Sequence, residues 1–511
     1  MDNLSNNKRL AKNTMMLYLR TLLIMLVSLY TTRIVLNSLG VEDYGVYNVV
    51  GGVVSILMSI NSAMSGAASR FTSYALGQND DNLCKRTFST IVITHWIIAA
   101  IILLLGETIG LWLVMEKLNI PEGRETAAMI CYQCSMAIST LSILNVPYNA
   151  IIIGHERMDA YAYISIIDVA LKLAIALILS YSSFDRLILY SIFLVFAQGL
   201  VTLCYIIFCR KKFEESHSQL VLDRYLFKQI ASFGGWTFYG QLACAGYIQG
   251  INILMNLFFG PVVNAARGIA VQVQNGAKIL VNNFQVALRP QMIKTWAQGD
   301  ISYMHKLVVY SSKFSFFLTA LTVFPLVITI CPILRIWLVD VPDHTVAFVR
   351  IILYTMLLES FNHGMIVSVH ATGNIRKFQI WESSTLLSVV PICYCLLRFC
   401  HISPEQVMIV YFFVQMAAQV VRLYIVLPQI QMSLTRYILD IFPRVIIVFS
   451  LLFIPSLFIQ IGSDKDILFT LVYLMVSFIF CSLIVYFIGL NKSEKKLALS
   501  FAKNIIHKTM K

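Results

Sequence analysis

Charged and amide side chains recur at regular spacing within one apolar stretch of the sequence, residues 265–289. They are Arg267, Gln274, Lys278, Gln285 and Arg289, at intervals of seven, four, seven and four residues. On an α-helix these positions fall within about 60° of one another, so they form one polar stripe. Guanidinium and ammonium groups bind phosphate oxygens, and amides exchange hydrogen bonds with sugar hydroxyls. The stripe therefore predicts binding of an anionic, hydroxyl-bearing ligand.

Other ionisable residues also stand inside apolar stretches, among them Arg33, Arg70 and Glu359. A cation at mid-membrane depth costs about 2.5–3.5 kcal/mol, so such a residue faces a partner or an aqueous cavity. Asp168 and Lys172 are four residues apart and are expected to neutralise each other along one helix face. Asp168 and Glu359 are the candidate carboxylates for coupling transport to an ion, H⁺ or Na⁺.

The stripe at residues 265–289 has two interpretations: it lines a wet cavity, or it faces an acidic neighbouring helix. Few carboxylates stand inside the apolar stretches, which favours the cavity. Lys313 and Glu382 lie near the ends of their stretches, so their polar ends are expected to extend to the membrane surface. With Arg33 and Arg70 added, the predicted substrate-binding set is a cationic cavity.

Helices across a membrane must position these residues, because the chain has too little polar material for a water-facing surface. Of its 511 residues 58% are hydrophobic and 13% charged, against roughly 25% charged in soluble proteins. Apolar windows predict an all-α polytopic protein of about fourteen transmembrane helices, two six-helix lobes and two C-terminal helices. The predicted parts are an N-terminal lobe (1–209), a cytoplasmic linker (210–227), a C-terminal lobe (228–427), two further helices (428–490) and a basic amphipathic tail (491–511).

The distribution of Lys and Arg predicts the topology. Roughly 23 fall in loops on one side and about 7 on the other, which places both termini in the cytoplasm. The net charge of +13 follows from the same bias, so no nucleic-acid partner is predicted. The tail from Lys492 is expected to lie on the inner leaflet, in contact with membrane lipids.

Catalytic, metal and cofactor chemistry is not predicted. Cys131 and Cys134 form a C-x-x-C pair on an apolar helix, and no further Cys or His stands at ligand spacing. The loops are too short to build the carboxylate site of a membrane glycosyltransferase or polymerase. The sequence predicts a transporter that is not an enzyme, without metal or cofactor.

Several loop motifs resemble those of the Wzx-type O-antigen and capsule flippases, the polysaccharide-transporter branch of the MATE-like (MOP) flippase superfamily. They occur in the expected order along nearly the whole chain: LGVEDYGVY at 39–47, PYNA at 147–150, ERM at 156–158, FGGW at 233–236 and ATGN at 371–374.

This resemblance implies a MATE-like fold, in the bacterial inner membrane. It also implies movement of an undecaprenyl-diphosphate-linked oligosaccharide from the cytoplasmic to the periplasmic leaflet by alternating access, for surface polysaccharide synthesis. Related lipid II flippases carry cavity arginines on the first, second and eighth helices, where Arg33, Arg70 and Arg267 stand here. Glycan polymerases and glycosyltransferases are the candidate protein partners.

One alternative remains open within the same superfamily, a cation-coupled multidrug exporter. Such a protein needs an acidic cavity in the first lobe, and Asp168 is the candidate for it.

Overall fold

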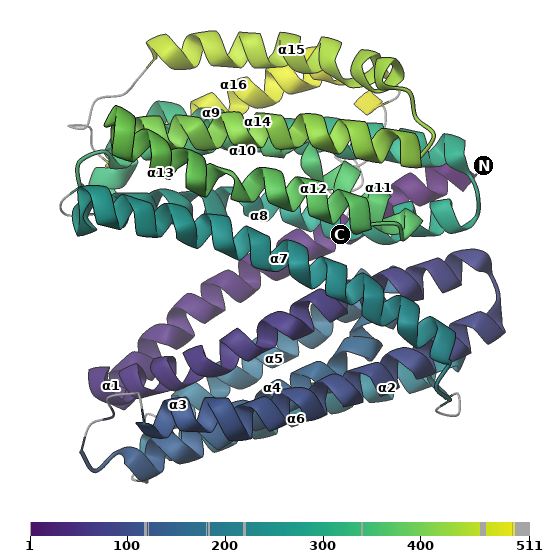
Figure 1. Ribbon diagram of the computed structural model, residues 1–511, viewed down its shortest axis with the longest axis vertical. Helices are drawn as coiled ribbons and strands as arrows, with labels where there is room; N and C mark the ends of the chain where they lie inside the picture. Colours follow the sequence, from purple (N-terminus) through teal and green to yellow (C-terminus); the bar gives the residue numbers. More distant parts are fainter. Residues whose placement is uncertain are drawn as a thin grey trace, which may run out of the picture. The chain divides into compact units, whose positions relative to one another are not determined.

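The computed structural model describes residues 2–116, 120, 122–179, 181, 184–217, 221–338, 341–459, 467–492 and 494–495. These residues form helices and connecting loops, and no strand occurs among them. The chain divides into two compact units (Figure 1), unit 1 (Met1–Phe238 with Trp296–Gln298) and unit 2 (Tyr239–Thr295 with Gly299–Lys511).

Unit 1 is a bundle in which α4 packs against α1, α2 and α6, and α5 packs against α1 and α6. A left-handed residue interrupts α1: Gly40 has φ 80° and ψ 169°. Its φ is positive and its ψ is extended, so the chain turns there and a second helical segment follows. The helices are α1 (Asp2–Gln78), α2 (Asp81–Leu105), α3 (Leu111–Glu116), α4 (Glu125–Gly154), α5 (Met158–Leu179) and α6 (Arg186–Lys212).

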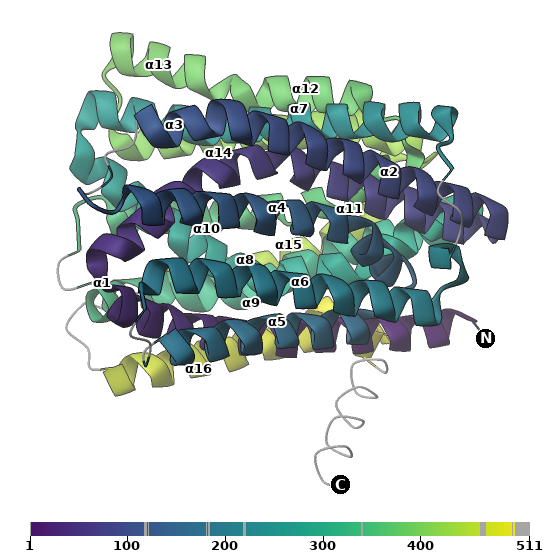
Figure 2. The same ribbon diagram turned by 90° about the horizontal axis from the view of Figure 1, so that it is seen from below.

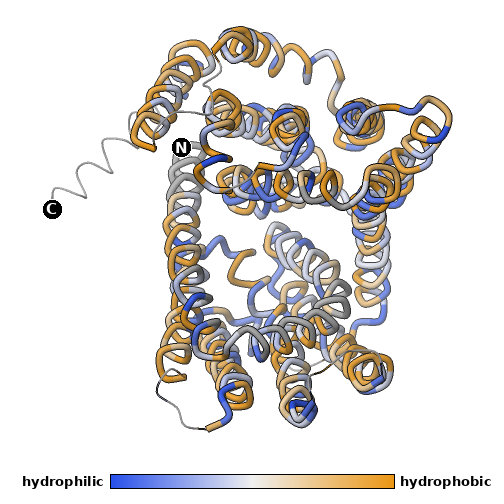
Figure 3. The backbone as a smooth tube through the Cα atoms, turned by 90° about the vertical axis from the view of Figure 1, so that its left-hand side faces the viewer, coloured by the Kyte–Doolittle hydropathy of each residue, from blue (hydrophilic) through white to orange (hydrophobic). Residues whose placement is uncertain are grey.

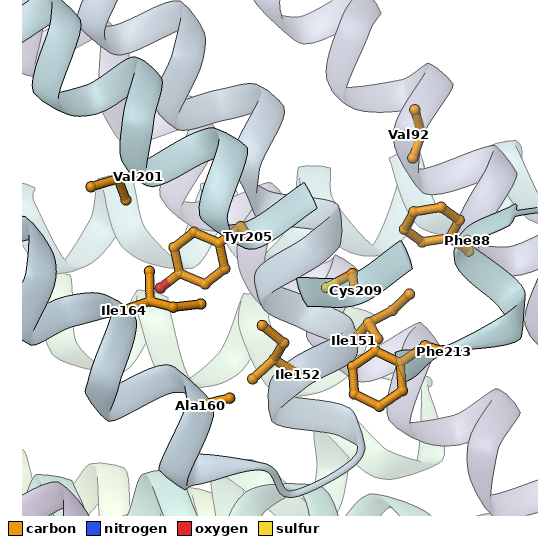
Figure 4. Packing of buried hydrophobic residues seen from close by; sticks show 10 residues of the cluster. All are labelled: Phe88, Val92, Ile151, Ile152, Ala160, Ile164, Val201, Tyr205, Cys209 and Phe213. Atoms are coloured by element: carbon orange, nitrogen blue, oxygen red, sulfur yellow. The ribbon is translucent and has the colours of Figure 1, made fainter. Parts of the chain in front are cut away.

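Apolar side chains from α2, α4, α5 and α6 meet in the core of unit 1 (Figure 4). Ile151 and Ile152 of α4 lie at the centre of this cluster, with Tyr205 and Cys209 of α6 beside them. In a membrane such side chains stabilise the bundle by van der Waals packing, because lipid tails are as apolar as the side chains themselves. Phe213, just after α6, completes the cluster.

The segment after α6 is held on unit 1 by side-chain contacts. His155 stacks on Phe213, with ring centroids 4.2 Å apart, and its Nε2 lies 2.6 Å from Glu215 Oε1. Asp223 caps the next helix, α7 (Arg224–Phe259), because its Oδ1 accepts from the backbone N–H groups of Tyr225 and Leu226 at 2.9 and 3.1 Å. The predicted linker 210–227 thus contains the end of α6, this docked segment and the start of α7.

Unit 2 is built around α9, which packs against α10, α11, α15 and α16. The helices α12 and α13 follow each other, and α14 runs back beside both (Figures 1 and 2). A bend of 42° separates α10 from α11. The remaining helices are α8 (Pro261–Ala297), α9 (Ile301–Trp337), α10 (Thr345–Glu359), α11 (Asn362–Thr372), α12 (Arg376–Leu387), α13 (Val389–Cys400), α14 (Pro404–Gln429), α15 (Leu434–Phe458) and α16 (Ile467–Ile484).

The membrane character of the chain is visible in Figure 3, where hydrophobic positions (orange) run along most helices. Among the described residues, 11 helices are long and apolar enough to cross a membrane, or 12 if α10 and α11 make one span. Two further stretches, residues 41–78 of α1 and α8, are helical but are not apolar enough over a membrane-spanning length. The predicted count of fourteen is therefore not confirmed.

The predicted division into lobes, linker, two further helices and tail remains a prediction. Nearly all of the tail, 491–511, lies outside the described residues.

Candidate functional site

A cavity of about 500 Å³ lies within unit 2, between α7, α8, α10, α12 and α14. Its size falls in the range of ligand pockets, about 300–1,000 Å³. One wall is the polar face of α8, and the opposite walls carry amide, hydroxyl and carboxylate groups. Gly240 of α7 permits one close approach, since a Cβ atom there would clash with Gln379 Oε1 of α12.

The α8 stripe divides between this cavity and the protein interior. Arg267, Gln274 and Lys278 line the cavity, together with Asn282 at the edge of the stripe. Gln285 does not: it is buried, accepts a hydrogen bond from Ser311 Oγ at 3.0 Å and donates to Ser315 of α9. Arg289, the last stripe residue, is half-buried and is not part of the cavity wall.

Lys278 has a carboxylate partner, contrary to the expectation for the stripe. Its Nζ lies 2.8 Å from Glu359 Oε2 at the end of α10. The expectation failed because α8 and α10 are distant in sequence, and their juxtaposition cannot be seen from spacing. Arg267 differs, because it donates to Asn252 of α7, a neutral amide that leaves its charge in place.

Hydrogen bonds extend from Glu359 across the cavity to α14. Tyr411 Oη donates to Glu359 Oε1 at 3.0 Å, and Gln415 Nε2 donates to Tyr411 Oη at 2.8 Å. The Tyr411 ring stacks with Tyr247 of α7, with centroids 6.0 Å apart. Tyr247, Glu359, Tyr411 and Gln415 all line the cavity.

A second ion pair in the cavity wall joins α12 to α14. Arg422 Nε donates to Glu382 Oε1 at 2.6 Å, and the side chains are 3% and 10% exposed. Glu382 was expected to extend to the membrane surface, which is wrong because a buried guanidinium holds it. Sequence reasoning missed Arg422 and Gln415. The signal was available: Gln415, Gln419 and Arg422 stand four and three residues apart, on one face of an apolar helix.

Lys313 on α9 also has a partner that its position did not predict. Its Nζ lies 2.7 Å from Glu494 Oε2, after α16, with 2% and 7% of the side chains exposed. The ammonium is enclosed by the chain rather than directed to the membrane surface, and it lies near the rings of Phe314 and Phe317. This pair ties the chain that follows α16 to the centre of unit 2.

The remaining predicted site residues belong to unit 1. Arg33 is exposed on α1. Arg70, also on α1, is buried with its guanidinium 4.4 Å from the Phe71 ring centroid and 5.5 Å from that of Phe233. Asp168 is paired with Lys172 at 2.8 Å, as their spacing predicts. Unit 2 alone therefore holds the cavity residues Arg267, Gln274, Lys278 and Glu359.

Comparison with solved structures shows the fold. The chain has the fold of a multidrug resistance MATE family transporter of the MOP superfamily in its outward-facing conformation (TM-score 0.72, 13% identity, 83% of this chain and 96% of that one). It is similar to a MOP superfamily transporter from Pyrococcus furiosus, described as having a binding pocket of reverse polarity (TM-score 0.69, 13%, 83% and 96%). A MATE transporter in complex with Rb⁺ is also similar (TM-score 0.70, 14%, 85% and 97%).

These structures thus show the fold, and the apolar helices show a multi-pass membrane protein. Residues 10–296 match the family described as polysaccharide biosynthesis protein. The chain belongs to this family, that of the Wzx-type flippases whose motifs it carries. No curated protein matches the chain.

Proposed function

We propose that the protein moves an undecaprenyl-diphosphate-linked oligosaccharide from the cytoplasmic to the periplasmic leaflet of the bacterial inner membrane by alternating access. The observation that carries this proposal is the cavity of unit 2, where Arg267 and Lys278 lie beside amides on one wall. Arg422 is the third cation in the cavity wall. The wall also carries two carboxylates, Glu359 and Glu382. An anionic head group with attached sugars matches this composition.

Arg267 is the residue best placed to hold the diphosphate. Its partner Asn252 is neutral, so an incoming anion meets an undiminished positive charge. Lys278 would give a second contact by exchanging Glu359 for a phosphate oxygen, and Gln274 lies between them along α8. The polyprenyl chain would stay in lipid. Arg33 and Arg70 of unit 1, and Arg289 beyond the cavity, remain proposed substrate contacts. Gln285 does not, because Ser311 and Ser315 use its hydrogen-bonding groups.

We propose Glu359, in preference to Asp168, as the residue that couples transport to H⁺ or Na⁺. Glu359 lines the cavity and shares its partner Lys278 with the proposed substrate, whereas Asp168 is held by Lys172. The proposed topology keeps both termini in the cytoplasm, since positive loops resist translocation. Reporter fusions at each end would test this orientation. A polymerase or glycosyltransferase of the same glycan pathway is the proposed protein partner.

A strain lacking the gene tests the function when complemented with variants. Arg267→Gln with Lys278→Gln should abolish surface glycan while the protein stays in the membrane at normal abundance. Gln429→Met, on α14 but outside the cavity, is the matched control and should export normally. Normal glycan from the double variant would show that the stripe is structural and would refute the proposal.

The same strain separates this function from multidrug export. An organic cation needs a free carboxylate, and Glu359 and Glu382 are both paired with cations in this cavity. Loss of the protein should therefore alter glycan and leave drug susceptibility unchanged. Drug hypersensitivity with intact glycan would favour the exporter.

A further inference from the structure

Two amide oxygens of residues that line the cavity lack hydrogen-bond donors. Gln415 Oε1 on α14 and Asn362 Oδ1 on α11 are buried, in side chains 3% and 9% exposed, and neither accepts a hydrogen bond from any residue that the structure describes. Both residues line the cavity. A buried acceptor left unpaired is unfavourable, because nothing replaces its hydrogen bond to water, so a donor from a ligand would be stabilised here.

The orientation of the Gln415 amide follows from its neighbours. Glu359 is a carboxylate and only accepts, so the Tyr411 hydroxyl must give its proton to Glu359. Tyr411 oxygen can then only accept, and Gln415 must present its NH₂ group to it. The amide oxygen of Gln415 is thereby left as an acceptor without a donor. This chain of bonds starts at Lys278, the cation on the facing wall.

Asn362 lies in the cavity wall, three residues after Glu359. It is the first residue of α11, and Glu359 is the last residue of α10, on the other side of the 42° bend. Both residues line the cavity, so Asn362 belongs to the same site as the Lys278–Glu359 pair.

The amide oxygens of Gln415 and Asn362 can bind one part of the proposed substrate, its glycan, but not its diphosphate. Diphosphate oxygens accept hydrogen bonds and suit Arg267 and Lys278, but they cannot donate to an amide oxygen. A sugar hydroxyl or an N-acetyl N–H can. We propose that Gln415 and Asn362 form a glycan subsite, which accepts hydrogen bonds from the sugar attached directly to the diphosphate. This inference rests on the proposed function and assigns a second recognition surface to the same cavity.

Binding of two lipids to the purified full-length protein in lipid nanodiscs tests the subsite. One probe is undecaprenyl diphosphate, which has no sugar, and the other is the lipid-linked oligosaccharide purified from a strain lacking the transporter. Gln415→Met and Asn362→Leu keep side-chain size and remove the acceptor. Each should weaken binding of the oligosaccharide lipid about 5–150-fold, the cost of leaving the sugar's donor group unpaired, and leave the undecaprenyl diphosphate affinity within about twofold of the native value.

Gln429→Met on the same helix is the control and should change neither affinity. The two variants are independent tests. If one of them does not fold, the binding affinities of the other still test the subsite. Equal losses for both probes, or no loss for the oligosaccharide lipid, would overturn the subsite, since water or packing would then account for the two oxygens. If the native protein binds neither probe, the proposed function itself fails. If it binds both probes equally, only the glycan subsite fails.

Discussion

Lys278 of α8 and Glu359 of α10 form an ion pair 2.8 Å long in the wall of the unit 2 cavity. The two residues are the cation and the carboxylate that an anionic substrate would separate. The carboxylate keeps a second bond, from Tyr411, so it is held in position when Lys278 moves away.

Neutralising each partner should have opposite effects on anion binding. Lys278→Gln removes a charge-assisted hydrogen bond, worth about 1.5–3 kcal/mol, and should weaken binding of undecaprenyl diphosphate about 10–100-fold. Glu359→Gln removes the competing carboxylate and should strengthen binding several-fold. Titration of both variants with the lipid measures this difference. Weaker binding in both variants would mean that the pair supports the fold instead of competing with the ligand.

Arg422 and Glu382 should contribute to the stability of the protein mainly as a pair. Removing one member of a buried pair leaves an uncompensated charge and costs about 3–5 kcal/mol. We expect Arg422→Met and Glu382→Leu each to lower the free energy of unfolding by that amount, and the double variant to recover most of it. Denaturant unfolding in detergent micelles provides the measurement. If the two losses simply add, the pair is not coupled.

Gly40 should not tolerate a side chain. Its φ of 80° and ψ of 169° lie in a region open essentially to glycine alone, and strain there costs about 1–3 kcal/mol. Gly40→Ala should reduce the thermal stability of the protein accordingly. Gly51→Ala in the same α1 is the control, because a Cβ there meets open space and should be neutral or slightly stabilising. Equal effects at both positions would contradict this explanation.

Asp223 should make the start of α7 sensitive to acid. The backbone N–H of Leu226, followed by the Arg86 guanidinium, holds the pKa of Asp223 below its ordinary value despite burial. A lowered folded-state pKa stabilises the protein above the unfolded pKa, about 3.9, and this stabilisation is lost as the pH falls through the folded value.

Asp223→Ala should therefore cost about 1 kcal/mol at neutral pH, the usual value of a helix N-cap. The difference from the native protein should disappear once the pH falls below the lowered folded-state pKa of Asp223. Thermal melts at several pH values measure it, and a loss that persists in acid would exclude the cap as its cause.

The sequence was sufficient for the helices and for the direction of the α8 stripe, because both depend on local periodicity. It placed Arg267, Gln274 and Lys278 on one face, and the structure lines one cavity with them. Partners were not predictable. Glu359 lies 81 residues from Lys278 in sequence, and only packing of α8 near α10 brings them together. Glu382 was misplaced for the same reason, since its partner Arg422 is on another helix.

The end of the stripe shows a further limit. Gln285 has the right spacing for a ligand contact, but Ser311 and Ser315 of α9 use its hydrogen-bonding groups. Periodicity tells which face a residue occupies, and it does not tell whether that face meets a cavity or another helix. Arg267 and Gln285 share one face of α8, but Arg267 meets the cavity and Gln285 meets α9.

The pair Lys313–Glu494 sets a boundary for engineering the C-terminal end. A protein shortened before residue 494 would leave the Lys313 ammonium enclosed without its counter-charge. Purification tags and reporter domains therefore belong beyond Lys495 or at the N-terminus. Low yield of a shortened chain would then reflect the loss of this counter-ion. Replacing Lys313 with Met in the shortened chain should restore the yield.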